Sequence, residues 1–147
     1  MRAALDQAAA AAALGEVPVG SVVVHQGEIV AAAHNRRLLD ADPTAHAELL
    51  AMRQAAGRLG DWRLEGCEVY VTLEPCPMCA GAMVLARIDR CIYGCADPKG
   101  GFLGTLADLS QVPGLNHHFP VTRGVLQEPC SRALKDFFRA LRRARAN

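Results

Sequence analysis

The sequence predicts a single α/β domain over residues 1–147, built as a three-layer α/β/α sandwich around a five-stranded mixed sheet. The chain has 147 residues, about the size of one domain, and 51% of them are hydrophobic, which is enough for a buried core. Strand-like and helix-like segments alternate along most of the chain, which is typical of helices packed on a sheet. Aromatic residues make up only 5%, so we expect an aliphatic, alanine-rich core.

The N-terminal part of the chain predicts one helix followed by a β-hairpin. Met1–Leu14 is rich in alanine, which favours a helix, and Gly15 is typical of a helix end. Ser21–His25 contains three consecutive valines, and a Gln-Gly pair separates it from the apolar segment Glu28–Ala33. These two segments therefore predict antiparallel strands.

The central part of the chain predicts a helix, a strand, another helix and another strand. Thr44 is expected to cap a helix over Ala45–Ala56. A glycine and a proline bound the expected strand Cys67–Leu73, and proline at the first position favours a helix over Pro77–Ala86. The apolar segment Ile88–Cys95 predicts the next strand, so the strand–helix–strand units should be parallel crossovers.

The C-terminal part predicts a short helical turn, a last strand and a long helix. The expected turn is Leu106–Leu109, and the expected strand is Phe119–Val125. Ser131–Ala146 is strongly amphipathic, because an apolar stripe lies opposite its arginines. That stripe consists of Leu134, Phe137, Phe138 and Leu141.

The charge balance argues against a strongly basic nucleic-acid binder if only the sum is considered. Lys and Arg number 16 and Asp and Glu 15, for a net charge of +1. Residues 132–147 alone carry six basic residues and one acid, a net charge of +5, which leaves −4 for the rest. A mildly acidic body therefore carries a basic C-terminal segment.

The cysteines indicate a reducing compartment. An even count is compatible with disulfides in a secreted protein, but a chain of this size does not need them and no signal peptide is visible. No apolar run approaches the length of a membrane span, so we expect a cytoplasmic protein with no membrane contact. Cys67 and Cys91 are expected to be buried in strands, and Cys95 to be semi-exposed. The six cysteines are Cys67, Cys76, Cys79, Cys91, Cys95 and Cys130.

Two short stretches carry the chemistry, and together they match the pattern His-x-Glu … Pro-Cys-x-x-Cys of zinc-dependent deaminases. Cys76 and Cys79 are three residues apart at an expected helix start, where they share a face and the helix dipole favours thiolates. With His46 they predict a zinc site that has three protein ligands and one position open for water. Glu48 is two residues beyond His46, about 200° around a helix, so we expect it to move protons rather than bind the metal.

Each fragment of this pattern also has a simpler interpretation. Cys-Pro-Met-Cys alone is compatible with a redox pair or a structural zinc site, and a lone histidine is more often merely packed. The ordered conjunction favours catalytic zinc, because His46 and Cys76 are 30 residues apart with one expected strand between them. Two helix starts that follow neighbouring strands meet at one edge of a sheet, where α/β enzymes bind ligands.

The motifs around this signature resemble those of the bacterial tRNA-specific adenosine deaminases, and the resemblance covers nearly the whole chain. The matching segments are Glu16–Gly20, His34–Arg36, Asp42–Glu48, Tyr70–Cys76, Met78–Ala82, Tyr93–Gly94, Asp97–Gly100, Leu115–His117 and Asp136–Arg139. The resemblance implies a cytidine deaminase-like fold and hydrolytic conversion of adenosine to inosine at wobble position 34 of a tRNA anticodon. It further implies one Zn²⁺ per subunit, a homodimer, and no nucleotide cofactor. A free cytidine, cytosine or guanine deaminase on the same scaffold stays open as an alternative.

The resemblance also suggests roles for residues outside the metal site. Asn35 should hydrogen-bond the target nucleoside and Val19 should line the adenine pocket, although a loop-capping amide and a core residue are the simpler interpretations. Asp97 should meet a flanking ribose or backbone, unless it only forms the turn before a proline. The full implied set of substrate-binding residues is Asn35, Val19, Ala47, Asp97, Lys99 and His117. The basic C-terminal helix is either a solvated face or an RNA-phosphate surface formed by Arg139, Arg142 and Arg143.

Overall fold

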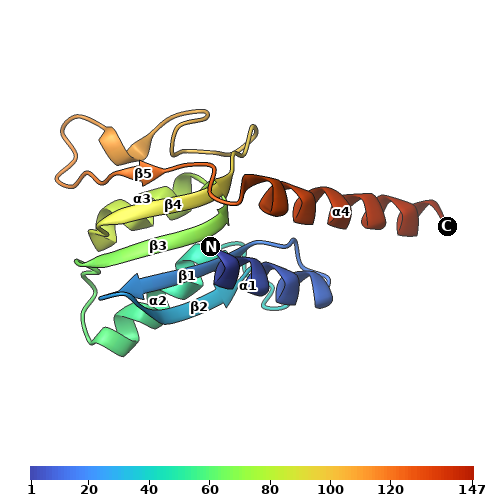
Figure 1. Cartoon of the computed structure of the whole chain (residues 1–147), viewed down its shortest axis with the longest axis horizontal. Helices are drawn as coiled ribbons and strands as arrows, with labels where there is room; N and C mark the ends of the chain where they lie inside the picture. The colour runs from blue at the N-terminus through green and yellow to red at the C-terminus, as the bar shows by residue number, and fades with distance from the viewer.

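The computed structural model describes residues 1–147 and contains a five-stranded mixed sheet in the order β2-β1-β3-β4-β5 (Figure 1). β1 (Gly20–His25) pairs antiparallel with β2 (Glu28–His34) on one side and with β3 (Cys67–Leu73) on the other. β4 (Arg90–Cys95) is parallel to β3, and the two-residue β5 (Val121–Thr122) is parallel to β4. The predicted hairpin and the predicted parallel crossover are both confirmed.

Two pairs of helices complete the three layers, as predicted. α1 (Arg2–Ala13) and α4 (Gln127–Ala146) contact one face of the sheet, and α2 (Ala47–Leu59) and α3 (Pro77–Ala86) cover the other (Figure 1). The core between α2, α3 and the sheet is mainly aliphatic, with alanine and valine as its main components. No helix combines the length and the apolar composition that crossing a membrane requires.

α1 packs unusually closely on β1. Ala4, Ala8 and Ala11 form its buried stripe, and Gly20 of β1 faces it. A Cβ atom on Gly20 would lie 2.0 Å from the carbonyl oxygen of Ala4 and 2.5 Å from the amide nitrogen of Ala8. Only small residues therefore fit on either side of this contact.

Several boundaries differ from the expected ones. α2 begins at Ala47 with His46 as its N-cap, not Thr44, because Asp42 accepts hydrogen bonds from the Thr44 amide and hydroxyl and holds a turn there. α2 also continues through Gly57 and ends at Leu59, followed by Gly60, whose φ of 74° suits a C-cap.

The C-terminal third shows three further differences. The short helical turn is the 3₁₀ helix η1 (Leu109–Gln111), three residues later than expected, because Asp108 accepts from the amide of Ser110 and caps it. The last strand is shorter than Phe119–Val125 because only Val121–Thr122 pair with β4. α4 begins four residues earlier than expected and extends away from the sheet, so that Cys130 is its one fully buried residue (Figure 1).

Candidate active site

The candidate site lies where α2 and α3 begin, at the carboxyl end of β3. His46 and Cys76 occupy the same structural position: each is the N-cap of its helix, with an extended backbone and no hydrogen bond from its side chain to the helix. Both carbonyls accept the first helical hydrogen bond, from Leu50 at 3.1 Å and from Ala80 at 2.9 Å. The two side chains are therefore free to point toward each other.

The three predicted ligands come together. His46 Nδ1 lies 3.5 Å from Cys76 Sγ and 3.5 Å from Cys79 Sγ, and the ligand atoms of all three are within 4.8 Å of one another. His46 and Cys76 are half-buried and Cys79 is buried. This group could hold a metal ion.

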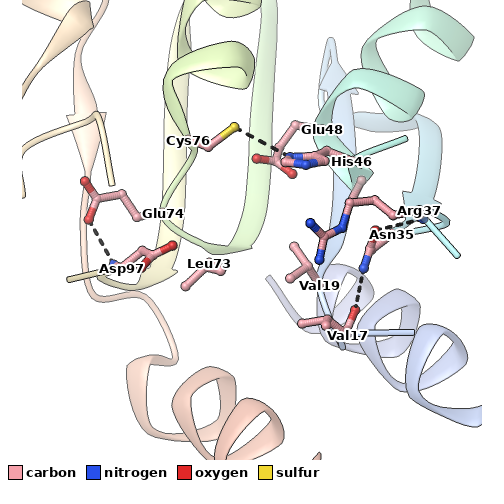
Figure 2. Close-up of a pocket in the computed structure, with 11 residues that line it drawn as sticks. Val17, Val19, Asn35, Arg37, His46, Glu48, Leu73, Glu74, Cys76 and Asp97 are labelled. Carbon is pink, nitrogen blue, oxygen red and sulfur yellow. Dashed lines mark hydrogen bonds between the residues drawn. The ribbon is translucent and has the colours of Figure 1, made fainter. Parts of the chain in front are cut away.

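Glu48, Cys76 and Cys79 all have strongly shifted pKa values, and the hydrogen bond with Cys76, together with burial, raises the pKa of Cys79. Glu48 lies in the first turn of α2 and is only 4% exposed, and this burial raises its pKa to about 7. Hydrogen bonds with Cys79 and with His46 lower the pKa of Cys76 to about 4, which favours the thiolate that a metal requires. His46 is outside the helix, so the expected 200° rotation does not apply; Figure 2 shows the Glu48 carboxylate beside the His46 ring.

A pocket opens over this group (Figure 2). Of the residues that the resemblance suggested, Val19, Asn35, Ala47 and Asp97 line it. The Asn35 amide donates to the Val17 carbonyl at 3.2 Å, and its oxygen accepts from the amide of Arg37, so it caps the loop while it lines the pocket.

The other suggested residues lie outside the pocket. Lys99 is exposed on the turn that follows Asp97, and His117 bonds the Ile88 carbonyl at 2.8 Å and stacks on Phe119. The exposed arginines of α4 lie on the helix that extends away from the sheet (Figure 1); they are Arg139, Arg142 and Arg143. Cys95 is buried rather than semi-exposed, because it is the last residue of β4, pairs with Leu73 of β3 and has its thiol near the Thr72 carbonyl.

The pocket is also lined by residues that the sequence did not predict as part of the site, which are Val17, Arg37, Leu73 and Glu74. Arg37 and Glu74 both line it, and the Arg37 guanidinium points into it without a hydrogen bond or an acidic partner (Figure 2). Its neighbour Arg36 is instead bound to Asp40 at 2.9 Å. The sequence did contain a signal for Arg37 and Glu74, because both follow the ends of strands that border the site, β2 and β3.

The fold and the site define a class of protein. A buried carboxylate beside a histidine and two cysteines, at the start of two helices on a mixed sheet, is the arrangement of the metal-dependent deaminases. A family model described as MafB19-like deaminase matches residues 1–142.

The relatives narrow the class. A tRNA-specific adenosine deaminase of Bacillus subtilis (strain 168) is 51% identical over 143 residues, covering 97% of this chain and 89% of the relative. Another from Aquifex aeolicus (strain VF5) is 45% identical, covering 97% and 93%. A solved structure from a study of A-to-I editing by tRNA:A34 deaminases has a TM-score of 0.88 at 41% identity, covering 91% of this chain and 97% of that one. The guanine deaminase of Bacillus subtilis aligns with a TM-score of 0.65 at 32% identity, covering 97% and 90%.

The chain belongs to the family of the tRNA-specific adenosine deaminases. Its predicted cytidine deaminase-like fold is confirmed by the same structural relatives.

Proposed function

We propose that this protein converts adenosine to inosine at wobble position 34 of tRNA anticodons by hydrolysis, with one Zn²⁺ per subunit. The observation that carries the proposal is the His46, Cys76 and Cys79 group beside buried Glu48, in a chain 51% identical to a tRNA-specific adenosine deaminase. A tRNA substrate also implies that the protein works in the cytoplasm.

The donor set fits zinc in type and in spacing. Two thiols and one imidazole are ligands that zinc prefers, and catalytic sites use three protein ligands. Tetrahedral bonds of about 2.3 Å to sulfur and 2.1 Å to nitrogen would separate the sulfur and nitrogen atoms by about 3.6 Å. The two observed separations are 3.5 Å. When bound, zinc supplies the acidity that lets a water molecule attack a ring carbon near neutral pH.

Glu48 is the residue we propose to move the protons. Its carboxyl has a pKa of about 7, so that it can both accept and release a proton near neutral pH. It would take one proton from the attacking water and deliver it to a ring nitrogen of adenine, and then take the second proton from the newly added hydroxyl and deliver it to the departing amino group. The overall reaction consumes one water and releases one ammonia.

The remaining pocket residues would hold a flipped-out base. Val19 and Ala47 supply apolar surface, and Asn35 supplies an amide whose position is already held by the loop. Asp97 would meet the ribose or backbone of a flanking nucleotide, and Lys99 a phosphate nearby. The α4 residues Arg139, Arg142 and Arg143 would contact the stem, so that substituting them should lower both RNA affinity and its dependence on salt.

The decisive experiment is incubation of an anticodon stem-loop with the zinc-loaded protein, followed by sequencing. We expect A-to-G conversion at the wobble position and no conversion elsewhere in the loop. Absence of conversion, with ammonia released from free nucleosides or bases, would overturn the proposal. Light scattering of the same sample tests the expected homodimer.

Guanine deamination is the second candidate, because the chain is 32% identical to a guanine deaminase of Bacillus subtilis along most of its length. The TM-score of 0.65 to that enzyme is below the 0.88 to the tRNA:A34 deaminase structure, so we rank it second. Guanine should therefore be included among the free bases tested in the assay for ammonia release.

A further inference from the structure

Glu74 is a buried carboxylate that the proposed chemistry does not use. It lies between the end of β3 and Cys76, and it is 2% exposed. It forms no ion pair, and the nearby Arg123 donates instead to the Leu103 carbonyl at 2.8 Å and to Asp108 at 3.4 Å. A buried carboxylate without a cation is costly unless hydrogen bonds satisfy it, so its hydrogen-bond partners indicate its purpose.

All the partners of the Glu74 carboxylate belong to the loop that follows β4, residues 97–105. Oε1 accepts from the backbone amide of Asp97 at 3.2 Å and from the hydroxyl of Thr105. Oε2 accepts from the amides of Leu103 and Thr105, each at 3.1 Å. Three backbone amides and one hydroxyl therefore converge on a single side chain.

Backbone contacts close the same loop against the segment that leads to the first cysteine ligand. The Phe102 amide donates to the Pro75 carbonyl at 2.9 Å, and the Glu74 amide donates to the Cys95 carbonyl at 2.8 Å. A Cβ atom on Gly101 would lie 2.3 Å from the carboxyl carbon of Glu74, so the loop approaches the carboxylate as closely as glycine allows.

Asp97 is the member of this loop that reaches the pocket. Its Oδ1 accepts from the amides of Lys99 at 2.9 Å and Gly100 at 3.2 Å, while its own amide is held by Glu74 (Figure 2). Its backbone is therefore held from the metal-ligand side and its side chain from the turn that follows.

We propose that Glu74 is a positioning residue that holds the 97–105 loop so that Asp97 faces the pocket. It sets the affinity for RNA through Asp97 and takes no part in proton transfer. The inference rests on the proposed function for the identity of the substrate.

Glu74→Gln tests this, because it preserves shape while replacing one acceptor oxygen with a group that donates. Asp108→Asn is the matched control, since that carboxylate caps η1 through Ser110 and does not bond Asp97. For Glu74→Gln we expect about tenfold faster amide hydrogen exchange at residues 97, 103 and 105 and a KM for the stem-loop raised about tenfold, with kcat within about twofold. Bound zinc should stay at one per chain, and Asp108→Asn should leave both KM and exchange at Asp97 unchanged.

A double-mutant cycle separates positioning from general stability. In an Asp97→Ala background, Glu74→Gln should change KM by less than about twofold, because the group through which it acts is already gone. A role in stability alone would give the same change in both backgrounds, and that result would overturn the proposal. Unchanged exchange in Glu74→Gln, or loss of zinc, would overturn it as well.

A second variant and the hydrogen-exchange measurement test the inference even if Glu74→Gln does not fold or the protein makes no inosine. Should Glu74→Gln not fold, Thr105→Val removes a single donor, and we expect an increase in KM of about threefold that disappears in the Asp97→Ala background; an unchanged KM refutes the inference. If the wild-type protein makes no inosine, the proposed function fails on its own. The hydrogen-exchange comparison then still decides whether Glu74 holds the loop.

Discussion

The contact between α1 and β1 makes a sharp prediction about Gly20. In Gly20→Ala the new methyl group would meet backbone atoms of the helix at 2.0 and 2.5 Å, and backbone cannot rotate aside as a side chain can. Helix α1 must then move by about 1 Å, which loosens the buried stripe of Ala4, Ala8 and Ala11. We expect a loss of about 3 kcal/mol, the upper end for overpacking.

Gly57→Ala is the matched control, because the same methyl group placed in the interior of α2 meets nothing within 4 Å. Alanine there should raise the free energy of unfolding by about 0.5–1 kcal/mol through helix propensity. With an m-value of about 2 kcal/mol/M, the urea midpoint should fall by about 1.5 M for Gly20→Ala and rise by about 0.3–0.5 M for Gly57→Ala. Midpoints that shift in the same direction would refute the packing argument.

Three further predictions concern the site. Glu48→Gln should retain zinc and the melting temperature while kcat falls by about 10²–10⁴-fold, and wild-type turnover would contradict the proposed proton transfer. Cys76→Ala should lose the metal, measured by elemental analysis, and melt at lower temperature, because the ligands tie two strand–helix units together; a full equivalent of bound zinc would indicate other ligands. Arg37→Ala should weaken stem-loop binding about tenfold and reduce its salt slope by about 0.7, one single-strand phosphate, as followed by fluorescence anisotropy. Arg36→Ala should change neither the affinity nor the salt slope, because that guanidinium is bound to Asp40. Equal losses of affinity in the two variants would mean that overall charge, and not the pocket, is responsible.

The elements that the sequence predicts to the residue are those with strong local boundaries. β3 lies between Gly66 and Pro75, and α3 begins with proline, so local chemistry decides both. The start of α2 could not be predicted in this way, because Thr44 and His46 both precede helical sequence and only the bond from Thr44 to Asp42 decides between them. The length of β5 likewise depends on its pairing with β4 rather than on its own composition.

In the candidate site too, some residues can be predicted from local sequence and others depend on contacts distant in the chain. The grouping of His46, Cys76 and Cys79 with Glu48 is predictable because the chemistry of zinc requires those residue types at a spacing that helices provide. The position of Glu74 after β3 was visible in the sequence, but its role in holding the loop was not, since its hydrogen-bond partners are 23 to 31 residues away in the chain. Cys95 was predicted wrongly from its place beside a loop, whereas its burial is decided by its pairing with β3 at the end of β4.

The way in which His46 and Cys76 are held implies a compromise between stability and function. His46 and Cys76 occupy N-cap positions without capping their helices, where serine or aspartate would contribute about 1 kcal/mol each. Both side chains instead point toward a shared site, with the positive ends of two helices beside two thiols and one carboxylate. A metal that binds only the folded chain would stabilise that chain by an amount that grows with the logarithm of its concentration divided by its Kd. Under the proposed function, metal binding would offset the missing caps and so link the folding of α2 and α3 to the proposed catalysis.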